Sequence, residues 1–199
     1  MKLSVITVVY NAAATIEDTL RSVAAQTHPD VEHIVIDGGS NDGTLAILER
    51  YRGGIARLVS EPDCGIYDAM NKGIALAGGE VIGLLNADDV YADGRVLGKI
   101  AQRFADPGVE ACYGDLVYVA QDDPQRVVRY WKSCAYRDGL FEKGWIPPHP
   151  TFFVRRSVYQ RYGGFDLTYR LQSDFELTMR FLAVHHIRSV HVPEILVRM

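Results

Sequence analysis

The sequence predicts an α/β fold in which helices flank a mostly parallel sheet. Two observations carry this prediction. Runs rich in Val, Ile and Leu alternate with stretches of helical spacing through the first half of the chain, as in consecutive βαβ units. Val, Ile and Leu dominate these runs without a strict alternation of polar and apolar residues, which is typical of strands that a parallel sheet buries on both faces.

The elements of the first half follow from this alternation. We expect strands over residues 3–9, 31–36, 56–60 and 80–85. Ile16, Leu20 and Val23 share one helical face and predict a helix over residues 14–26. Two further helices are expected, one from Asn41-Asp42-Gly43-Thr44 to about residue 51 and one over residues 67–77. Gly78-Gly79 is expected to end the last of these as a glycine C-cap.

After residue 93 the alternation loosens, and we expect a mixed arrangement of strands. Helices are expected over residues 94–104, 157–162 and 173–184. Strands are expected over residues 109–119, 127–131, 151–154 and 186–190, with a polar loop or hairpin at 121–125. No segment of the sequence has the composition of a linker between domains. The chain is therefore interpreted as a single domain over residues 1–199, with a natural division at about residue 92.

Composition and charge narrow the classes of function. The 199 residues are 48% hydrophobic and 23% charged, as in an ordinary globular protein that buries its own core. The net charge of −4 lacks the basic footprint of a nucleic-acid binder, so no nucleic-acid partner is expected. Three widely spaced cysteines fit the cytoplasm. No apolar run reaches the ~18–20 residues that a membrane span needs. Peripheral contact with the inner face of a membrane therefore stays open.

Polar residues follow each of the four strands predicted in the first half. The carboxyl ends of parallel strands meet at one edge of a sheet, and ligands bind there. The segments at this edge are Tyr10-Asn11, Asp37-Gly38-Gly39-Ser40, Glu61-Pro62-Asp63 and Asn86-Ala87-Asp88-Asp89. The sequence therefore predicts a ligand site that these four segments share.

The segment at Asp37 has two interpretations. Its two glycines permit close approach of a ligand to the backbone, and Asp37 could accept from a uracil-like N–H or from ribose hydroxyls. Alternatively, Asp37 ends a strand in a turn and Asp42 caps the next helix. A phosphate loop of the P-loop type is excluded, because no Gly-Lys-Ser/Thr follows.

The turn Asn86-Ala87-Asp88-Asp89 places two adjacent carboxylates directly after a buried strand. Like charges this close repel each other unless a cation or solvent relieves them. One or two carboxylates together with substrate phosphates are the usual ligands of Mg²⁺, and Mn²⁺ takes similar ones. The turn is thus a candidate Mn²⁺ or Mg²⁺ site at Asp88 and Asp89. The alternative is a solvated acidic loop in which Asp89 faces water.

Three segments together resemble the inverting glycosyltransferases of family 2, which have a Rossmann-like GT-A fold. The match covers about residues 3–90 and extends more loosely to about 185. The segments are Ser4-Val5-Ile6-Thr7-Val8-Val9-Tyr10-Asn11, Val35-Ile36-Asp37-Gly38-Gly39-Ser40-Asn41-Asp42-Gly43-Thr44 and Leu84-Leu85-Asn86-Ala87-Asp88-Asp89. The resemblance implies a nucleotide-sugar-binding half up to about residue 92 and an acceptor-side half after it.

The resemblance also implies roles for single residues. Asp37 would contact the nucleotide base, and Asp88 would be the metal-binding carboxylate of an Asp-any-Asp motif. Asn86 replaces the first Asp of that motif and removes one charge, so we expect weaker metal binding, with Asp89 as a secondary ligand. Tyr10 and Asn86-Ala87 are expected to contact the nucleotide-sugar.

An acidic general base is implied at the start of a downstream helix, in the segment Gln172-Ser173-Asp174-Phe175-Glu176-Leu177. We expect Asp174 to be this base, with Glu176 as the alternative. The structural interpretation is a capping box made by Ser173 and Glu176, with Asp174 close to the positive end of the helix dipole. Both interpretations can hold together.

Two further residues are candidates. His149 lies between prolines that stiffen its backbone, and we expect it on the acceptor side, with a structural histidine as the alternative. Asp68 forms an i,i+4 pair with Lys72 in a predicted helix. The resemblance implies that Asp68 could instead touch the donor sugar or ribose.

The expected function is transfer of a sugar, with inversion, from a UDP-linked donor to a hydroxyl of a saccharide or lipid-linked acceptor in cell-surface polysaccharide synthesis. A nucleotidyltransferase is one alternative, but Asn11-Ala12-Ala13-Ala14 is not its glycine-rich basic loop. A non-catalytic nucleotide-sugar-binding module is the other, and Asn86 keeps it open. The sequence also leaves open whether the protein forms a homodimer. The chain stops at Val197-Arg198-Met199, and relatives usually continue, so a further C-terminal piece is also open.

Overall fold

The structure is a computed structural model that describes all 199 residues. Its framework is one nine-stranded sheet in the order β3-β2-β1-β4-β8-β6-β9-β5, with β7 paired to β6 outside this path. The strands are β1 Leu3–Val9, β2 Val31–Asp37, β3 Arg57–Ser60, β4 Val81–Leu84, β5 Val90–Tyr91, β6 Ala111–Ala120, β7 Asp123–Trp131, β8 Phe153–Arg155 and β9 Ser189–Arg198. The helices are α1 Ile16–Ala24, α2 Thr44–Arg50, α3 Ile66–Leu76, α4 Val96–Arg103, α5 Arg156–Tyr162 and α6 Ser173–Met179.

Strands β3, β2, β1 and β4 are parallel, as the sequence predicts. The register pairs Val9 with Asp37 and Asp37 with Ser60, so the carboxyl ends of β1, β2 and β3 are level with one another. The mixed part begins where β8 pairs antiparallel with β4. The sheet thus passes without a break from the first half of the chain into the second.

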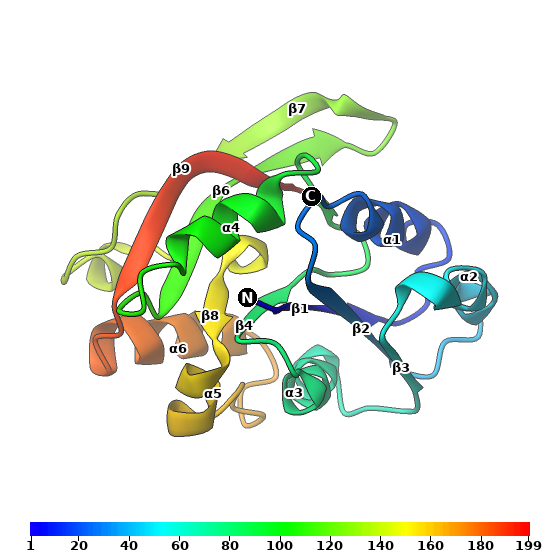
Figure 1. Cartoon of the computed structure of the whole chain (residues 1–199), viewed down its shortest axis with the longest axis horizontal. Helices are drawn as coiled ribbons and strands as arrows, with labels where there is room; N and C mark the ends of the chain where they lie inside the picture. The colour runs from blue at the N-terminus through cyan, green and yellow to red at the C-terminus, as the bar shows by residue number, and fades with distance from the viewer.

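Both faces of the sheet are covered by helices (Figure 1). Helices α1, α2 and α4 pack on one face, where Leu20 and Leu48 join the buried Val35. Helices α3, α5 and α6 pack on the other face, where Met70 and Leu177 belong to the cluster around Ile6. This two-sided burial explains why Val, Ile and Leu dominate the strands of the first half on both faces of the sheet. No helix combines the length and the hydropathy that crossing a membrane requires.

The second half differs from the prediction at three strands. Strand β5 is only two residues long, too short to produce a hydropathy pattern. Strand β7 begins at Asp123 and includes Pro124, within the predicted loop, because this exposed edge strand pairs irregularly with β6. Strand β9 runs over ten residues, well beyond the predicted segment 186–190, because it pairs with β6 along its length and with β5 at its C-terminal end.

The C-cap prediction for Gly78 and Gly79 is wrong. Helix α3 ends at Leu76, and Ala77 is already extended with φ −67° and ψ 123°. The two glycines permit close packing instead. The N–H of Gly78 donates to Glu32, and a Cβ on Gly79 would lie 2.7 Å from the backbone nitrogen of Ser4. Helix α5 ends at Tyr162 and is followed by Gly163, which has φ 81°.

A buried histidine in β2 makes the stability of this fold depend on pH. His33 is 4% exposed, and its Nε2 lies 3.0 Å from the hydroxyl of Thr7. Burial lowers the pKa of His33 to about 4. Because the unfolded state then binds more protons than the folded state below about pH 6.5, stability falls as the pH falls.

We expect His33 to account for about 2 kcal/mol of the unfolding free energy lost between pH 7 and pH 5. Urea denaturation of wild type and His33→Gln at both pH values measures this difference, which should disappear in the variant. The control is His186→Asn, because His186 is exposed and should leave the pH dependence unchanged. Equal pH dependence in wild type and His33→Gln would contradict the assignment.

Candidate functional site

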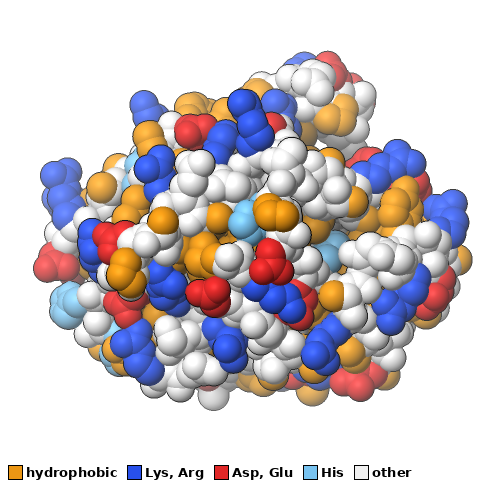
Figure 2. Space-filling model, viewed as in Figure 1, with side chains coloured by type: hydrophobic (Ala, Val, Ile, Leu, Met, Phe, Trp, Pro, Cys, Tyr) orange, Lys and Arg blue, Asp and Glu red, His pale blue; other side chains and the backbone are white.

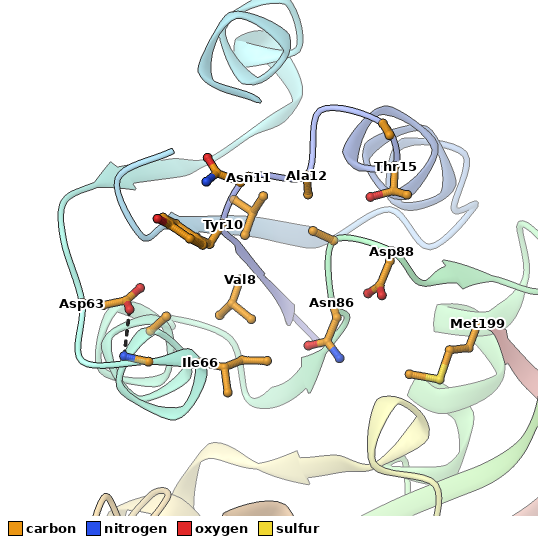
Figure 3. A pocket seen from close by; sticks show the side chains of 15 residues that line it. Val8, Tyr10, Asn11, Ala12, Thr15, Asp63, Ile66, Asn86, Asp88 and Met199 are labelled. Carbon is orange, nitrogen blue, oxygen red and sulfur yellow. Dashed lines mark hydrogen bonds between the residues drawn. The ribbon is translucent and has the colours of Figure 1, made fainter. Parts of the chain in front are cut away.

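A cavity of 660 Å³ lies at the carboxyl ends of β1 and β4, within the range of ~300–1,000 Å³ common for ligand sites. Its walls come from the segment after β1, the turn after β4 and the start of α3 (Figure 3). Tyr10 and Asp63 lie toward one end, and Asn86 and Asp88 lie toward the other, with Val8 between them (Figure 3). The cavity is therefore at the predicted edge of the sheet.

Tyr10 forms part of the wall, and the residue is 64% exposed. The segment after it is fixed to the loop that follows β2. The N–H of Asn11 donates to the hydroxyl of Ser40 at 2.8 Å, and the side chain of Asn11 accepts from the N–H of Asn41 at 2.9 Å. These contacts hold Asn11 at φ 50°. They place Tyr10 at the cavity, where the residue is accessible to a ligand.

Asp37 does not line the cavity, although the sequence predicts it at the base. It is fully buried, and one carboxylate oxygen accepts from the N–H of Gly39 at 3.1 Å and from the hydroxyl of Ser60 at 2.7 Å. The hydroxyl and N–H of Ser40 donate to the carboxylate as well. Asp37 thus joins the ends of β2 and β3 to the glycine loop, and its acceptor positions are engaged within the protein.

We expect Asp37→Ala to lower the unfolding free energy by about 2–4 kcal/mol, because it leaves several buried donors without an acceptor. Thermal and urea unfolding of the ligand-free protein measure this loss. Asp42→Ala is the matched comparison and should cost less. Asp42 also accepts loop hydrogen bonds, at 3.0 Å from the N–H groups of Ala13 and Thr44, but it is exposed. An Asp37→Ala protein as stable as wild type would contradict this structural role.

Asn86, Ala87 and Asp88 line the cavity, and Asp89 does not. The Asp88 side chain is exposed there. The amide oxygen of Asn86 and both carboxylate oxygens of Asp89 are buried without a hydrogen-bond partner. Burial, and secondarily the charge of Asp88, raise the pKa of Asp89 to about 7.

The side-chain oxygens of Asn86 and Asp88 could help to hold a divalent cation. No three His, Cys, Asp or Glu side chains are grouped so that they would hold a metal ion without other ligands. The exposed carboxylate of Asp88 and the unpartnered oxygen of Asn86 instead fit a cation that takes its remaining ligands from substrate phosphates. Asp89 is fully buried and does not line the cavity, so it is less well placed than Asp88 to be a ligand of such a cation.

Asp174 stands at the start of α6, where the hydroxyl of Tyr67 donates to its carboxylate at 2.9 Å. Tyr67 directly follows Ile66, which lines the cavity. Burial and the Asp174 hydrogen bond raise the pKa of Tyr67. Its ring stacks on Phe165 with centroids 5.3 Å apart. Sequence reasoning missed this contact, because the partners are 107 residues apart.

The predicted capping box at α6 is wrong. Ser173 is the first residue of the helix, and its hydroxyl donates to the backbone oxygen of Asp166 at 3.0 Å. The residue before it, Gln172, has φ 65° and provides no side-chain cap. Glu176 accepts from Arg180 at 2.6 Å, in an i,i+4 ion pair. Glu176 is therefore engaged, and Asp174 is the carboxylate that remains available.

His149 and Asp68 do not line the cavity. Both ring nitrogens of His149 are buried without a partner, and its ring meets Phe165 edge to face at 5.8 Å. Burial lowers the pKa of His149, and the charge of Asp174 opposes that shift. Asp68 accepts from the N–H of Cys64 at 3.0 Å and lies 3.6 Å from Lys72. The predicted i,i+4 pair of Asp68 and Lys72 is thus present.

The chain belongs to glycosyl transferase family 2, which matches residues 4–163. An uncharacterized glycosyltransferase of Mycobacterium tuberculosis is 33% identical over 181 residues, which cover 89% of this chain and 68% of the relative. A PGL/p-HBAD biosynthesis glycosyltransferase of Mycobacterium bovis is 32% identical over 182 residues, with the same coverage.

Solved structures of low sequence identity share the fold. S. aureus TarS 1-349 in complex with UDP-GlcNAc has a TM-score of 0.78 at 19% identity and matches 100% of this chain and 58% of that chain. The mannosyltransferase PcManGT from Pyrobaculum calidifontis, in complex with GDP-Man and Mn²⁺, has a TM-score of 0.75 at 23% identity and matches 100% and 56%. This chain thus has the predicted GT-A fold and spans less than two thirds of either solved chain.

Proposed function

We propose that this chain transfers a sugar, with inversion and with a divalent metal, from a UDP-linked donor to a hydroxyl of a saccharide or lipid-linked acceptor. The observation that carries the proposal is the charge of the cavity. Its lining holds the carboxylates of Asp63 and Asp88 but no Lys or Arg. A diphosphate would need a cation there, because no protein side chain supplies positive charge.

In the proposed mechanism, each residue acts from its observed position. Asp88 and the amide oxygen of Asn86 would hold the cation, and its positive charge would stabilise the diphosphate leaving group. Asp174 would accept the proton of the acceptor hydroxyl as that hydroxyl attacks the anomeric carbon from the opposite side. Tyr67 would keep the Asp174 carboxylate oriented through its hydrogen bond. The bond from sugar to diphosphate breaks as the new glycosidic bond forms.

The names of the relatives support this proposal. PcManGT is a mannosyltransferase shown with GDP-Man and Mn²⁺, and TarS is shown with UDP-GlcNAc. The relative from Mycobacterium bovis is named a PGL/p-HBAD biosynthesis glycosyltransferase, and this name agrees with a role in cell-surface polysaccharide or glycolipid synthesis.

We infer a cytoplasmic site of action with peripheral attachment to the inner face of a membrane. A homodimer stays a prediction. Charged side chains of both signs are interspersed on the face that Figure 2 shows.

A panel of nucleotide-sugars tests the proposal. We expect UDP-glucose, UDP-galactose or UDP-GlcNAc to raise the melting temperature in Mn²⁺, and EDTA to remove the effect. Slow hydrolysis of the same donor without acceptor should release UDP. A protein that no nucleotide-sugar stabilises, with EDTA without effect, would contradict the proposal. Stabilisation without any hydrolysis or transfer would favour the non-catalytic binding module, the alternative that Asn86 keeps open.

A further inference from the structure

The carboxylate of Asp63 occupies the space that a side chain at Gly38 would fill. A Cβ added to Gly38 would lie 2.5 Å from Oδ2 of Asp63 and 3.5 Å from Cδ2 of Tyr10. The carboxylate is therefore packed against the backbone of the glycine loop and beside the Tyr10 ring. The glycine at residue 38 is what permits this approach, because any larger residue would displace Asp63.

The hydrogen bonds of Asp63 leave one of its oxygens available. Oδ1 accepts from the N–H of Gly65 at 2.9 Å, which fixes the direction of the side chain (Figure 3). Oδ2 has no hydrogen-bond partner within the protein, and Asp63 lines the cavity. Asp37, by contrast, is buried behind the glycine loop with both oxygens engaged. Of these two carboxylates, only Asp63 presents an acceptor to a ligand.

We propose that Asp63 recognises the nucleotide base by accepting the N3–H of uracil on Oδ2, while the exposed Tyr10 ring stacks on the base. This assignment rests on the proposed function and specifies the donor nucleotide. A carboxylate can only accept hydrogen bonds, so it matches the N3–H donor of uracil and repels the N3 lone pair of cytosine. It takes over the contact that the sequence resemblance gave to Asp37.

The position of Asp63 in the cavity suits this task. Asp63 and Tyr10 lie across the cavity from Asn86 and Asp88 (Figure 3). A nucleotide whose base contacts Asp63 would extend its diphosphate toward the proposed cation ligands. The apolar side chains of Val8 and Ile66 lie between these two ends of the cavity (Figure 3), where the ribose would lie.

The experiment compares the binding of UDP and CDP, which differ in the hydrogen-bonding groups at positions 3 and 4 of the base. Isothermal titration calorimetry in Mn²⁺ gives both dissociation constants for wild type and Asp63→Asn. We expect wild type to prefer UDP, and the variant to bind UDP up to about 10-fold more weakly, because the neutral amide oxygen can still accept the N3–H but forms a weaker hydrogen bond than the carboxylate. The variant should lose the preference over CDP, because an amide can donate to cytosine N3.

The matched control is Glu61→Gln. Glu61 is exposed, pairs with Lys72 at 2.9 Å and does not line the cavity, so its loss should leave both affinities unchanged. Unchanged UDP affinity and an unchanged UDP-to-CDP ratio in Asp63→Asn would overturn the assignment while the proposed function stands. A wild-type protein that binds none of UDP, GDP, ADP or dTDP would overturn the proposed function and the assignment together.

Discussion

Asp174→Asn is expected to lower the rate of sugar transfer about 100- to 10,000-fold and to leave donor affinity unchanged. The amide has the shape of the carboxylate and can still accept the Tyr67 hydrogen bond, which is 2.9 Å long in the wild-type structure, but it cannot take a proton from the acceptor. General bases typically contribute a factor of about 10² to 10⁴. Steady-state transfer kinetics and calorimetric binding of UDP measure the two quantities separately.

Glu176→Gln is the control for this prediction, because Glu176 is the other carboxylate near the start of α6. Its ion pair with Arg180 gives it a structural task. We expect a lower melting temperature and a transfer rate close to that of wild type. If Asp174→Asn retained full transfer activity, Asp174 would not be the base. A selective loss of the transfer rate in Glu176→Gln would assign the role to Glu176.

Asp88→Ala is expected to weaken UDP binding in Mn²⁺ about 100-fold or more, because the cavity lining offers no Lys or Arg to replace the lost cation. The Asp88 side chain is exposed, so the melting temperature of the ligand-free protein should not change. Without the carboxylate, titrations in Mn²⁺ and in EDTA should give the same affinity. Calorimetry under both conditions, with the melting temperature, measures all three quantities.

Two variants control for the loss of charge in Asp88→Ala. Asp30→Ala removes one exposed negative charge away from the cavity and should have no effect on binding. Asp88→Asn leaves the turn with an amide at position 88 as well as at Asn86. This variant should bind UDP more weakly than wild type, because a carboxylate is a stronger cation ligand than an amide. A wild-type protein that binds UDP equally well in EDTA would remove the metal from the proposal.

The parallel part of the fold could be predicted because buried strands and amphipathic helices leave direct periodic signals. Helix α1 and strands β1, β2 and β4 lie close to their predicted positions. The second half was harder, because its strands depend on distant partners. Strand β9 pairs with β6 in parallel and with β5 antiparallel, and no local pattern encodes such pairing. The end of α3 was missed because Gly78 and Gly79 serve packing, not the termination of the helix.

The location of the site at one edge of the sheet could be predicted from the sequence, but the contacts of its individual residues could not. Tyr10, Asn86, Ala87 and Asp88 do line the cavity. From the sequence alone, Asp37 and Asp63 are equally plausible at that edge, since Asp37 ends β2 and Asp63 lies three residues after the end of β3. Only the three-dimensional packing shows that Asp37 is saturated by Ser40 and Ser60. The close approach of Asp63 to Gly38 depends on where β3 lies beside β2, and a single sequence does not show this.

The hydrogen bond between Tyr67 and Asp174 sets a limit on how such a protein can be recombined. The hydroxyl belongs to α3, in the half that is proposed to bind the donor, and the carboxylate belongs to α6, in the other half. A chimera joined near residue 92 would take these two groups from different parents. It would keep an oriented carboxylate only if its first parent supplied a hydroxyl at residue 67. The two halves are therefore not independent modules, and exchanges that aim at new acceptors must conserve this pair.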